Sequence, residues 1–259
     1  MTATQAADPP LLRADADGIA TLTLNRPGQF NALSTELLDA LQAELAKLGA
    51  DETVRVVVVA GAGKAFCAGH DLKQMRANHD KAYMQALFKQ CGRVMQTLAE
   101  LPQPVIARVH GVATAAGCQL VASCDLAVAA DVAKFAVSGI NVGLFCSTPA
   151  VALARNIGRK QALEMLLTGD FIDALEAQRR GLVNRVVPSD MLDAEVRRLA
   201  DSIRAKSLTA IAMGKQLFYR QLEMGLAGAY QLAGETMACN MMTDDAVAGI
   251  DGFMNKKKG

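Results

Sequence analysis

The chain has 259 residues, of which 51% are hydrophobic, and its 27 Lys and Arg residues almost balance 26 Asp and Glu residues. A chain of this size can bury one large core, or one core with a small helical appendage, rather than two independent domains. The net charge of +1 gives no broad basic field to attract nucleic acid or anionic lipid, so we expect a small-molecule ligand.

Targeting and membrane signals are absent from the sequence. The first ten residues contain no basic region followed by an apolar run, and nowhere do about 18 apolar residues follow one another. The six cysteines lack CxxC spacing and indicate neither a disulfide framework nor a zinc site. We expect a cytoplasmic protein that does not bind membranes; a mitochondrial location would suit a eukaryotic relative, but no transit peptide is seen.

A strand, a loop and a helix are predicted first along the chain. Residues 19–24 alternate apolar and Thr side chains as a half-buried strand does. Ser34 can cap the helix that follows, in which leucines recur at helical spacing as far as Leu48. The β-branched run 54–59 is typical of a strand buried on both faces of a parallel sheet, and a loop, 61–70, follows it.

The same alternation continues through the middle of the chain. Apolar residues from Met84 to Leu98 mark one face of a long helix, which Pro102 ends. Two more strands are predicted over residues 105–109 and 126–130. Because strands alternate with helices, we predict an α/β fold with a mainly parallel sheet and crossover helices.

Strand patterns stop from about residue 189 onward. Helices rich in Leu and Met are predicted over residues 192–203, 208–222 and 227–242. These helices carry more apolar surface than three isolated helices could bury, so we expect them to contact another subunit.

The stretch from Pro104 to Asp125 carries the clearest chemical signal. After a strand, the small residues 113–117 predict a turn that opens a short helix from about Ala116 to Cys124. The N–H groups at the start of such a helix lack partners, and the helix dipole adds positive potential there. Small side chains let a ligand carbonyl approach these groups, which is what an oxyanion hole requires.

A second small-residue loop, residues 64–72 (KAFCAGHDL), follows the predicted strand 54–59. The two loops, together with residues 25–33 (NRPGQFNAL), resemble the crotonase family, which includes enoyl-CoA hydratases and isomerases. Three later segments fit the same family in the same order: residues 163–169, 181–188 and 249–253. The resemblance covers nearly the whole chain. It is especially strong, over residues 113–149, to the enoyl-CoA hydratase domain-containing subgroup, which includes a mitochondrial mammalian branch.

The resemblance implies an architecture and a ligand. It implies a crotonase-like spiral of strand-strand-helix units over residues 1–200, with an acyl-CoA site, followed by a helical segment over residues 201–259 that forms a homotrimer or a dimer of trimers. Coenzyme A would enter as part of the substrate, with no bound cofactor. No metal site is predicted, because Cys67, His70 and Asp71 have no second ligand cluster to complete them.

The family pattern implies that the backbone N–H groups of Ala68 and Ala116 hold the thioester oxygen. One such donor is typically worth about 3 to 4 kcal/mol of the reaction barrier. Ala115 and Ala116 replace glycines that are usual in the family, which either tightens the acyl slot or shifts the backbone. The alternative is that both loops merely turn the chain, and the paired pattern argues against it.

Both glutamates of the standard hydratase pattern are absent, because this chain has Gln119 and Gly139 at their positions. A hydratase needs a base to activate water and an acid to protonate the α-carbon, and carboxyl groups can do either. The Gln119 amide can orient water or a carbonyl but cannot carry the proton at neutral pH. We therefore expect ordinary crotonyl-CoA hydration to be weak or absent. A simple double-bond shift is also disfavoured, because isomerases of the family commonly keep a carboxylate at the position of Gly139.

His70 and Ser147 are the candidates to replace the missing acid/base groups. The unperturbed pKa of histidine is about 6.5, which suits proton transfer. The alternative is that His70 is exposed and begins a helix that Asp71 helps to cap. Ser147 falls where some dienoyl-CoA isomerases and a dehalogenase of the family carry an aspartate, and Cys146 is a neighbouring candidate. A packed Cys146 and a helix-capping Ser147 are the plainer interpretations.

Coenzyme A brings phosphates, which the family surrounds with basic side chains, sometimes from a neighbouring subunit's C-terminal helix. The candidates here are Arg26, Lys73, Phe253 and Lys256. A solvated tail is the alternative for residues 256–258. Residues 61–64 do not form a phosphate loop, because no Ser or Thr follows Lys64.

Three functions remain open from the sequence. An enoyl-CoA hydratase or isomerase with non-standard acid/base groups would lose turnover when His70 or Ser147 is changed. A decarboxylase or thioester hydrolase fits the missing glutamates better, because loss of CO₂ from a malonyl-type thioester needs enolate stabilisation more than a strong base. The third function is non-catalytic acyl-CoA binding. RNA binding, known in one branch of the family, finds little support in a net charge of +1.

Overall fold

The computed structural model describes residues 8–256. The strands in this part of the chain form two β-sheets. The larger sheet has the order β1-β2-β3-β5-β7-β10, with strands β1 Leu11–Ala16, β2 Ile19–Leu24, β3 Val56–Gly61, β5 Val105–Val109, β7 Leu126–Ala130 and β10 Arg185–Val187. The smaller sheet has the order β4-β6-β8-β9, with strands β4 Ala65–Cys67, β6 Val112–Thr114, β8 Lys134–Ala136 and β9 Ile172–Asp173. Only the β1–β2 and β8–β9 pairs of these two sheets are antiparallel, so the predicted α/β class with mainly parallel pairing is confirmed.

Helices surround the sheets and continue beyond them to the end of the described chain. They are α1 Thr35–Gly49, α2 Leu72–Ala77, α3 Lys81–Glu100, α4 Ala116–Ser123, α5 Ser147–Asn156, α6 Arg159–Thr168, α7 Ala174–Arg180, α8 Leu192–Arg204, α9 Leu208–Leu222, α10 Leu226–Met241 and α11 Asp244–Lys256. Short 3-10 helices lie at η1 Pro27–Gln29, η2 Ser138–Val142 and η3 Ser189–Met191. None of the helices in the described part of the chain is long and apolar enough to cross a membrane.

Successive turns of the chain each add one strand to the larger sheet and one to the smaller sheet. Strands β3 and β4 precede α2 and α3, β5 and β6 precede α4, and β7 and β8 precede η2 and α5. This is the predicted spiral of strand-strand-helix units. The expected loop over residues 61–70 is wrong in part, because β4 lies inside it. A strand of three residues is too short to show a periodic pattern in the sequence.

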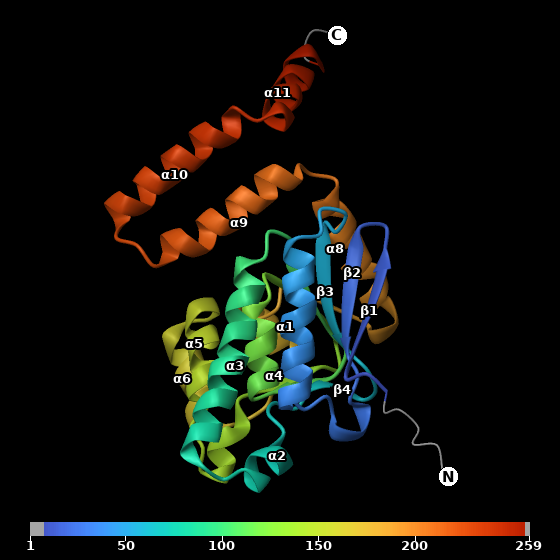
Figure 1. Cartoon of the computed structure of the whole chain (residues 1–259), viewed down its shortest axis with the longest axis vertical. Coiled ribbons are helices and arrows are strands. Elements are labelled where there is room, and N and C mark those ends of the chain that lie inside the picture. Colours follow the sequence, from blue (N-terminus) through green and yellow to red (C-terminus); the bar gives the residue numbers. More distant parts are fainter. Residues whose placement is uncertain (1–7, 257–259) are drawn as a thin grey trace.

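Alternate side chains of the larger sheet enter two separate cores. Leu22 of β2 and Val57 of β3 face the main core with the leucines of α1, whereas Ile19 and Val58 pack in a second cluster with residues of α8. The period of two in the strands therefore places helices on both faces of the sheet (Figure 1). Ser34 caps α1 as predicted, since its side chain accepts a hydrogen bond from the N–H of Leu37 at 3.3 Å.

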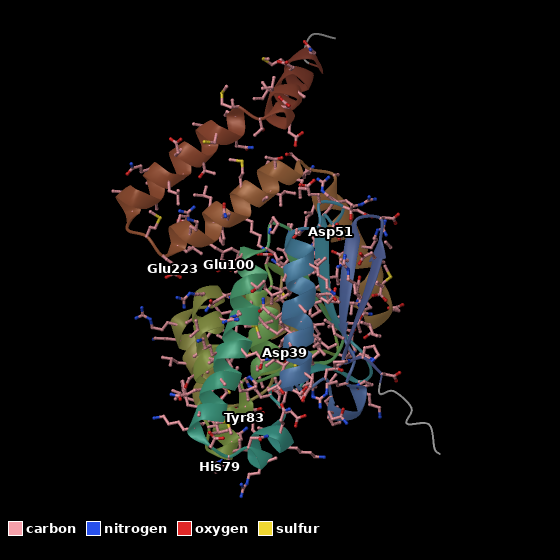
Figure 2. All side chains as sticks on the ribbon, in the orientation of Figure 1. Asp39, Asp51, His79, Tyr83, Glu100 and Glu223 are labelled. Carbon is pink, nitrogen blue, oxygen red and sulfur yellow. The ribbon has the colours of Figure 1, made fainter. Side chains whose placement is uncertain are left out.

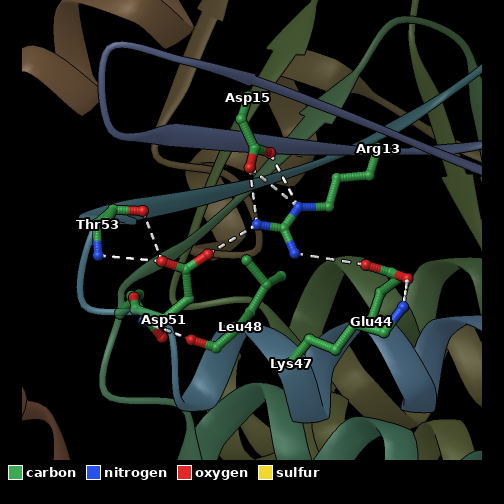
Figure 3. Close-up of polar contacts among 8 residues, drawn as sticks. Arg13, Asp15, Glu44, Lys47, Leu48, Asp51 and Thr53 are labelled. Atoms are coloured by element: carbon green, nitrogen blue, oxygen red, sulfur yellow. Dashed lines mark hydrogen bonds and ion pairs between the residues drawn. The ribbon is translucent and has the colours of Figure 1, made fainter.

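Strand β1 was not predicted, because its sequence mixes apolar residues with charged ones. Arg13 on this strand forms ion pairs with Asp15 at 2.7 Å, Asp51 at 3.0 Å and Glu44 at 3.5 Å (Figure 3). Glu44 belongs to α1 and Asp51 lies just beyond that helix. The charged residues of β1 thus attach the edge of the larger sheet to the end of α1, in place of an apolar pattern.

Helices α9, α10 and α11 are hereafter called the arm. Helix α9 lies across one end of the core near α3, and α10 and α11 extend beyond it (Figure 1). The predicted helices 192–203, 208–222 and 227–242 correspond to α8, α9 and α10. Within the described chain no residue of α9 or α10 is fully buried, and large apolar side chains such as Tyr230 and Met242 are 74% and 81% exposed. Helix α8 packs on the larger sheet as far as Ile203 and ends at Arg204.

Candidate active site

Two loops that follow strands of the smaller sheet meet at one point. The first site loop, residues 67–71, follows β4, and the second site loop, residues 115–117, follows β6. A Cβ atom on Gly69 would lie 2.8 Å from the Cβ of Ala115 and 3.2 Å from the backbone nitrogen of Ala116, and Gly69 has φ +95°. A Cβ on Gly117 would collide with the carbonyl of Cys67. Both glycines are therefore needed for the two loops to touch.

Ala68, the residue expected to be an oxyanion donor, does not present a free N–H group in the structure. Its N–H group donates to the carbonyl oxygen of Phe30 at 3.0 Å, so it is already engaged within the protein. The loop that supplies this carbonyl is held by Asn31, a buried residue at φ 55°. The Asn31 side-chain amide donates to the carbonyl oxygens of Ala62, Ala65 and Phe66. Sequence reasoning missed the role of Asn31, which was seen only as part of a family motif.

The backbone of His70, two residues after Ala68, lies in a different hydrogen-bonding environment. The N–H of Leu33 donates to the carbonyl oxygen of Gly69 at 2.7 Å, and the carbonyl oxygen of Leu33 accepts from the N–H of Asp71 at 3.1 Å. These two hydrogen bonds form a parallel bridge between Leu33 and His70. In such a bridge the amide of the central residue points away from its neighbour. Among the described contacts, the N–H of His70 has no backbone partner.

Ala116, for which the resemblance implies the other donor, lies at a helix start. It is the first residue of α4, where backbone N–H groups have no partner within the helix. Ala115 before it has φ 50° and ψ −120°, which is strained for a residue with a side chain, and its N–H donates to the carbonyl of Ala136 at 3.0 Å. The alanine at position 115 thus leaves the loop in a glycine-like conformation, with its methyl group against Gly69.

Gln119 lies inside the protein on α4. It is 4% exposed, and its Oε1 atom is buried without a hydrogen-bond partner in the described residues. A buried acceptor without a partner is costly, and such groups occur where water or a ligand is held. The position expected for the first glutamate therefore carries a neutral amide with one acceptor to satisfy.

The position of the second glutamate, Gly139, is filled by other groups. A Cβ atom there would lie 2.7 Å from the Sγ of Cys146 and 2.7 Å from the carbonyl oxygen of Leu144. Cys146 is 8% exposed, and burial raises the pKa of its thiol, so it is uncharged at neutral pH. This supports the interpretation of Cys146 as a packed side chain.

The imidazole of His70 is half-buried rather than exposed. Its ring meets that of Phe88 edge to face, with 5.4 Å between centroids, and its Nε2 atom is buried without a described partner. Burial lowers the pKa of His70 to about 4, so the ring is neutral at pH 7 and a poor base. The prediction that Asp71 helps to cap the following helix is confirmed. Its carboxylate accepts hydrogen bonds from the N–H groups of Lys73 and Gln74, both at 3.1 Å, at the start of α2.

Ser147 does not join the polar groups of the two site loops. Its side chain is exposed at the start of α5, and its hydroxyl donates to the carbonyl of Phe145 at 3.3 Å. No contact described in the structure links it to His70 or Gln119. A polar group absent from the sequence predictions is the hydroxyl of Tyr83 on α3 (Figure 2), which is buried without a described partner.

The four candidate coenzyme A contacts are not gathered in one place. Arg26 forms an ion pair with Asp71 at 2.8 Å and donates to the carbonyl of Ala32, so its guanidinium joins two loops of the protein. Lys73 is exposed on α2 nearby, whereas Phe253 lies on α11 in the arm and is 61% exposed. Lys256 ends α11, and its side chain lies outside the described residues. Among the described residues, no cluster of three His, Cys, Asp or Glu residues suited to a metal ion is found.

A spiral of this kind, with two small-residue loops in contact at Gly69 and Ala116, defines a crotonase-type fold. The enoyl-CoA hydratase/isomerase family profile matches residues 14–259, and the chain therefore belongs to this family. It is 46% identical over 242 residues to mouse enoyl-CoA hydratase domain-containing protein 3, mitochondrial, covering 93% of this chain and 81% of that protein. A probable enoyl-CoA hydratase from Rhizobium meliloti is 34% identical over 241 residues, covering 93% of both chains.

Solved structures agree with the sequence relatives. The crystal structure of an enoyl-CoA hydratase from Mycobacterium smegmatis has a TM-score of 0.95 and 58% identity, over 96% of this chain and 97% of the other. The crystal structure of human enoyl-CoA hydratase domain-containing protein 3 has a TM-score of 0.92 and 43% identity, over 95% of this chain and 98% of the other. The predicted resemblance to this subgroup is confirmed.

Proposed function

We propose that this protein binds an acyl-CoA thioester with the thioester oxygen between the N–H groups of His70 and Ala116, and that it stabilises the enolate of that thioester. The observation that carries the proposal is the contact of the two site loops, where Gly69 lies against the nitrogen of Ala116. Two fixed N–H donors aimed at a developing oxyanion stabilise it without reorganisation during the reaction. Membership of the family supports the acyl-CoA class of substrate.

Within this family role, ordinary hydration of crotonyl-CoA is disfavoured. Gln119 cannot transfer the required protons, and the space at Gly139 is taken by Cys146 and Leu144. The neutral imidazole of His70, with a pKa of about 4, is a weak base at neutral pH. A non-standard hydratase or isomerase that relies on His70 or Ser147 would have to work with one half-buried neutral ring and one exposed hydroxyl.

Decarboxylation of a malonyl-type thioester is the second candidate, and the two free amides favour it. In this reaction the bond between the α-carbon and the carboxylate breaks, CO₂ leaves, and the electron pair moves into the thioester enolate. The amides of His70 and Ala116 would stabilise that enolate, and solvent would return one proton to the α-carbon. Thioester hydrolysis would use the same amides for a tetrahedral oxyanion. Non-catalytic acyl-CoA binding would use them only to hold the carbonyl.

A panel of three assays tests these functions. The first assay measures crotonyl-CoA hydration as the loss of enoyl thioester absorbance, with an active hydratase as the positive control. The second measures malonyl-CoA turnover by product analysis, and the third measures acyl-CoA binding by calorimetry. We expect binding, with hydration near the uncatalysed rate. Rapid hydration would contradict the argument from Gln119 and Gly139, and a folded protein that binds no acyl-CoA would contradict the proposal as a whole.

We also propose that the chain divides into a core, residues 1–200, and an oligomerisation segment, residues 201–259, which contains the arm. We propose that this segment forms a homotrimer or a dimer of trimers. The exposed apolar side chains of the arm support this proposal, because a lone chain would leave them in water. For location we propose the cytoplasm. All six cysteines are free, which suits a reducing compartment, although the mouse relative is named as mitochondrial.

A further inference from the structure

A largely buried cluster of charged and polar side chains joins the arm to the rest of the protein. Lys215 on α9 forms an ion pair with Asp125, which lies between α4 and β7, at 2.7 Å between Nζ and Oδ2. The two side chains are 7% and 14% exposed. Tyr219, also on α9, donates its hydroxyl to Oδ1 of Asp125 at 2.7 Å. These three residues are called the anchor.

Every hydrogen-bonding group of the Lys215 ammonium is used. Besides Asp125, it donates to the carbonyl oxygens of Leu98 at 2.8 Å and Gln103 at 2.9 Å. The Asp125 carboxylate also accepts from the N–H of Val105 at 2.6 Å, where β5 begins. When the remaining donors and acceptors of a buried ion pair are hydrogen-bonded, these bonds offset the cost of removing the two charges from water. Removing one partner leaves a buried charge without compensation.

The other polar links between α9 and the core differ from the anchor in exposure. Glu223, at the end of α9 (Figure 2), pairs with Arg155 at 3.1 Å, but the two side chains are 65% and 56% exposed. Exposed ion pairs contribute little to stability. Apolar packing does not replace the anchor in the single chain, because α9 has no fully buried residue and Phe218 is 56% exposed.

We propose that the anchor sets the direction in which α9 leaves the core, and with it the pose in which the arm meets a second copy of the chain. Lys215 and Tyr219 are four residues apart and so lie on one face of α9. Both reach the same carboxylate, which the Val105 amide holds at the start of β5. The effect on the contact with a second copy rests on the proposed self-association. The effect on the direction of α9 depends on the single chain alone.

Three variants of the full chain test the anchor: Lys215→Met, Tyr219→Phe and, as the matched control, Glu223→Gln. Hydrogen exchange followed by mass spectrometry compares α9 and α10 with α1 and α3, and light scattering after size exclusion gives the molar mass at several protein concentrations. We expect Lys215→Met to speed exchange in α9 and α10 by at least about tenfold and to shift the assembly towards smaller species, because it leaves Asp125 buried without its cation. Exchange in α1 and α3 should be unchanged.

Tyr219→Phe removes one hydrogen bond without leaving an unpaired charge, so we expect exchange in α9 to rise by about fivefold. Glu223→Gln should match the wild type in both measurements. Wild-type exchange in α9 for both anchor variants would overturn the proposal, and if Lys215→Met does not fold, Tyr219→Phe decides alone. A monomeric wild type would contradict self-association, while the exchange measurements would still decide whether the anchor holds the arm.

Discussion

The thiol of Cys146 lies where a side chain on residue 139 would begin, since a Cβ atom on Gly139 would be 2.7 Å from its Sγ. The carbonyl of Leu144 closes the same space from the backbone, also at 2.7 Å. A side chain at residue 139, where the resemblance places the second glutamate, therefore has no room in this packing.

This packing predicts that Gly139→Glu will not recover hydration, even together with Gln119→Glu. Overpacking typically costs about 1 to 3 kcal/mol, so we expect Gly139→Glu to lower the free energy of unfolding by about that amount or more. Urea denaturation measures it. The control is Gly92→Glu on α3, where a Cβ has open space and where we expect no loss. Efficient crotonyl-CoA hydration by the double variant would show that the loop over residues 139–146 opens readily.

Gly69→Ala tests the contact between the two site loops. The new methyl group would meet the Cβ of Ala115 at 2.8 Å, and alanine is strained at φ +95°. We expect the loops to move apart and the affinity for acyl-CoA to fall by about tenfold or more, since a donor displaced from the oxyanion position loses its effect. Calorimetry measures the affinity. Gly28→Ala, which has open space, is the control; equal affinities for both variants would argue against an oxyanion site at this contact.

Ala115→Gly should stabilise the protein. Alanine at φ 50° and ψ −120° stores backbone strain that glycine does not, so we expect the free energy of unfolding to rise by about 1 kcal/mol. Thermal or urea unfolding measures the change. Ala40→Gly on α1 serves as the comparison, and we expect it to lower the free energy of unfolding, because glycine inside a helix costs about 1 kcal/mol relative to alanine. A loss of stability in Ala115→Gly would mean that contacts of the methyl group outweigh the strain.

His70 should make stability depend on pH in a definite direction. Its pKa is lowered by burial from 6.5 to about 4, so between these values the unfolded chain binds a proton that the folded protein does not. Stability therefore falls as the pH decreases through this window and is unaffected by His70 above it. His70→Asn should reduce the slope of unfolding free energy against pH between 6.5 and 4, with His79→Asn as the control. An unchanged slope in His70→Asn would mean that the ring is accessible to protons in the folded state.

The sequence by itself determined the elements that have a clear hydrophobic period. Strands 105–109 and 126–130 and helix 208–222 occur with the predicted bounds, because alternating burial and helical spacing act through neighbouring residues. The resemblance found in the sequence also implied that Gln119 and Gly139 stand at the positions of the two glutamates. It missed β1, where charged residues attach the strand to α1, and the short strands of the smaller sheet.

Only the tertiary structure decided which amide of the first site loop is free. The resemblance pointed to Ala68, but the carbonyl of Phe30 accepts a hydrogen bond from the N–H of Ala68. The bridge to Leu33 turns the N–H of His70, two residues later, away from Leu33. The same is true of the contact between Cys146 and Gly139, which a 3-10 turn brings together. A backbone N–H is identical in every residue except proline, so its availability depends on partners that the fold brings from elsewhere in the chain.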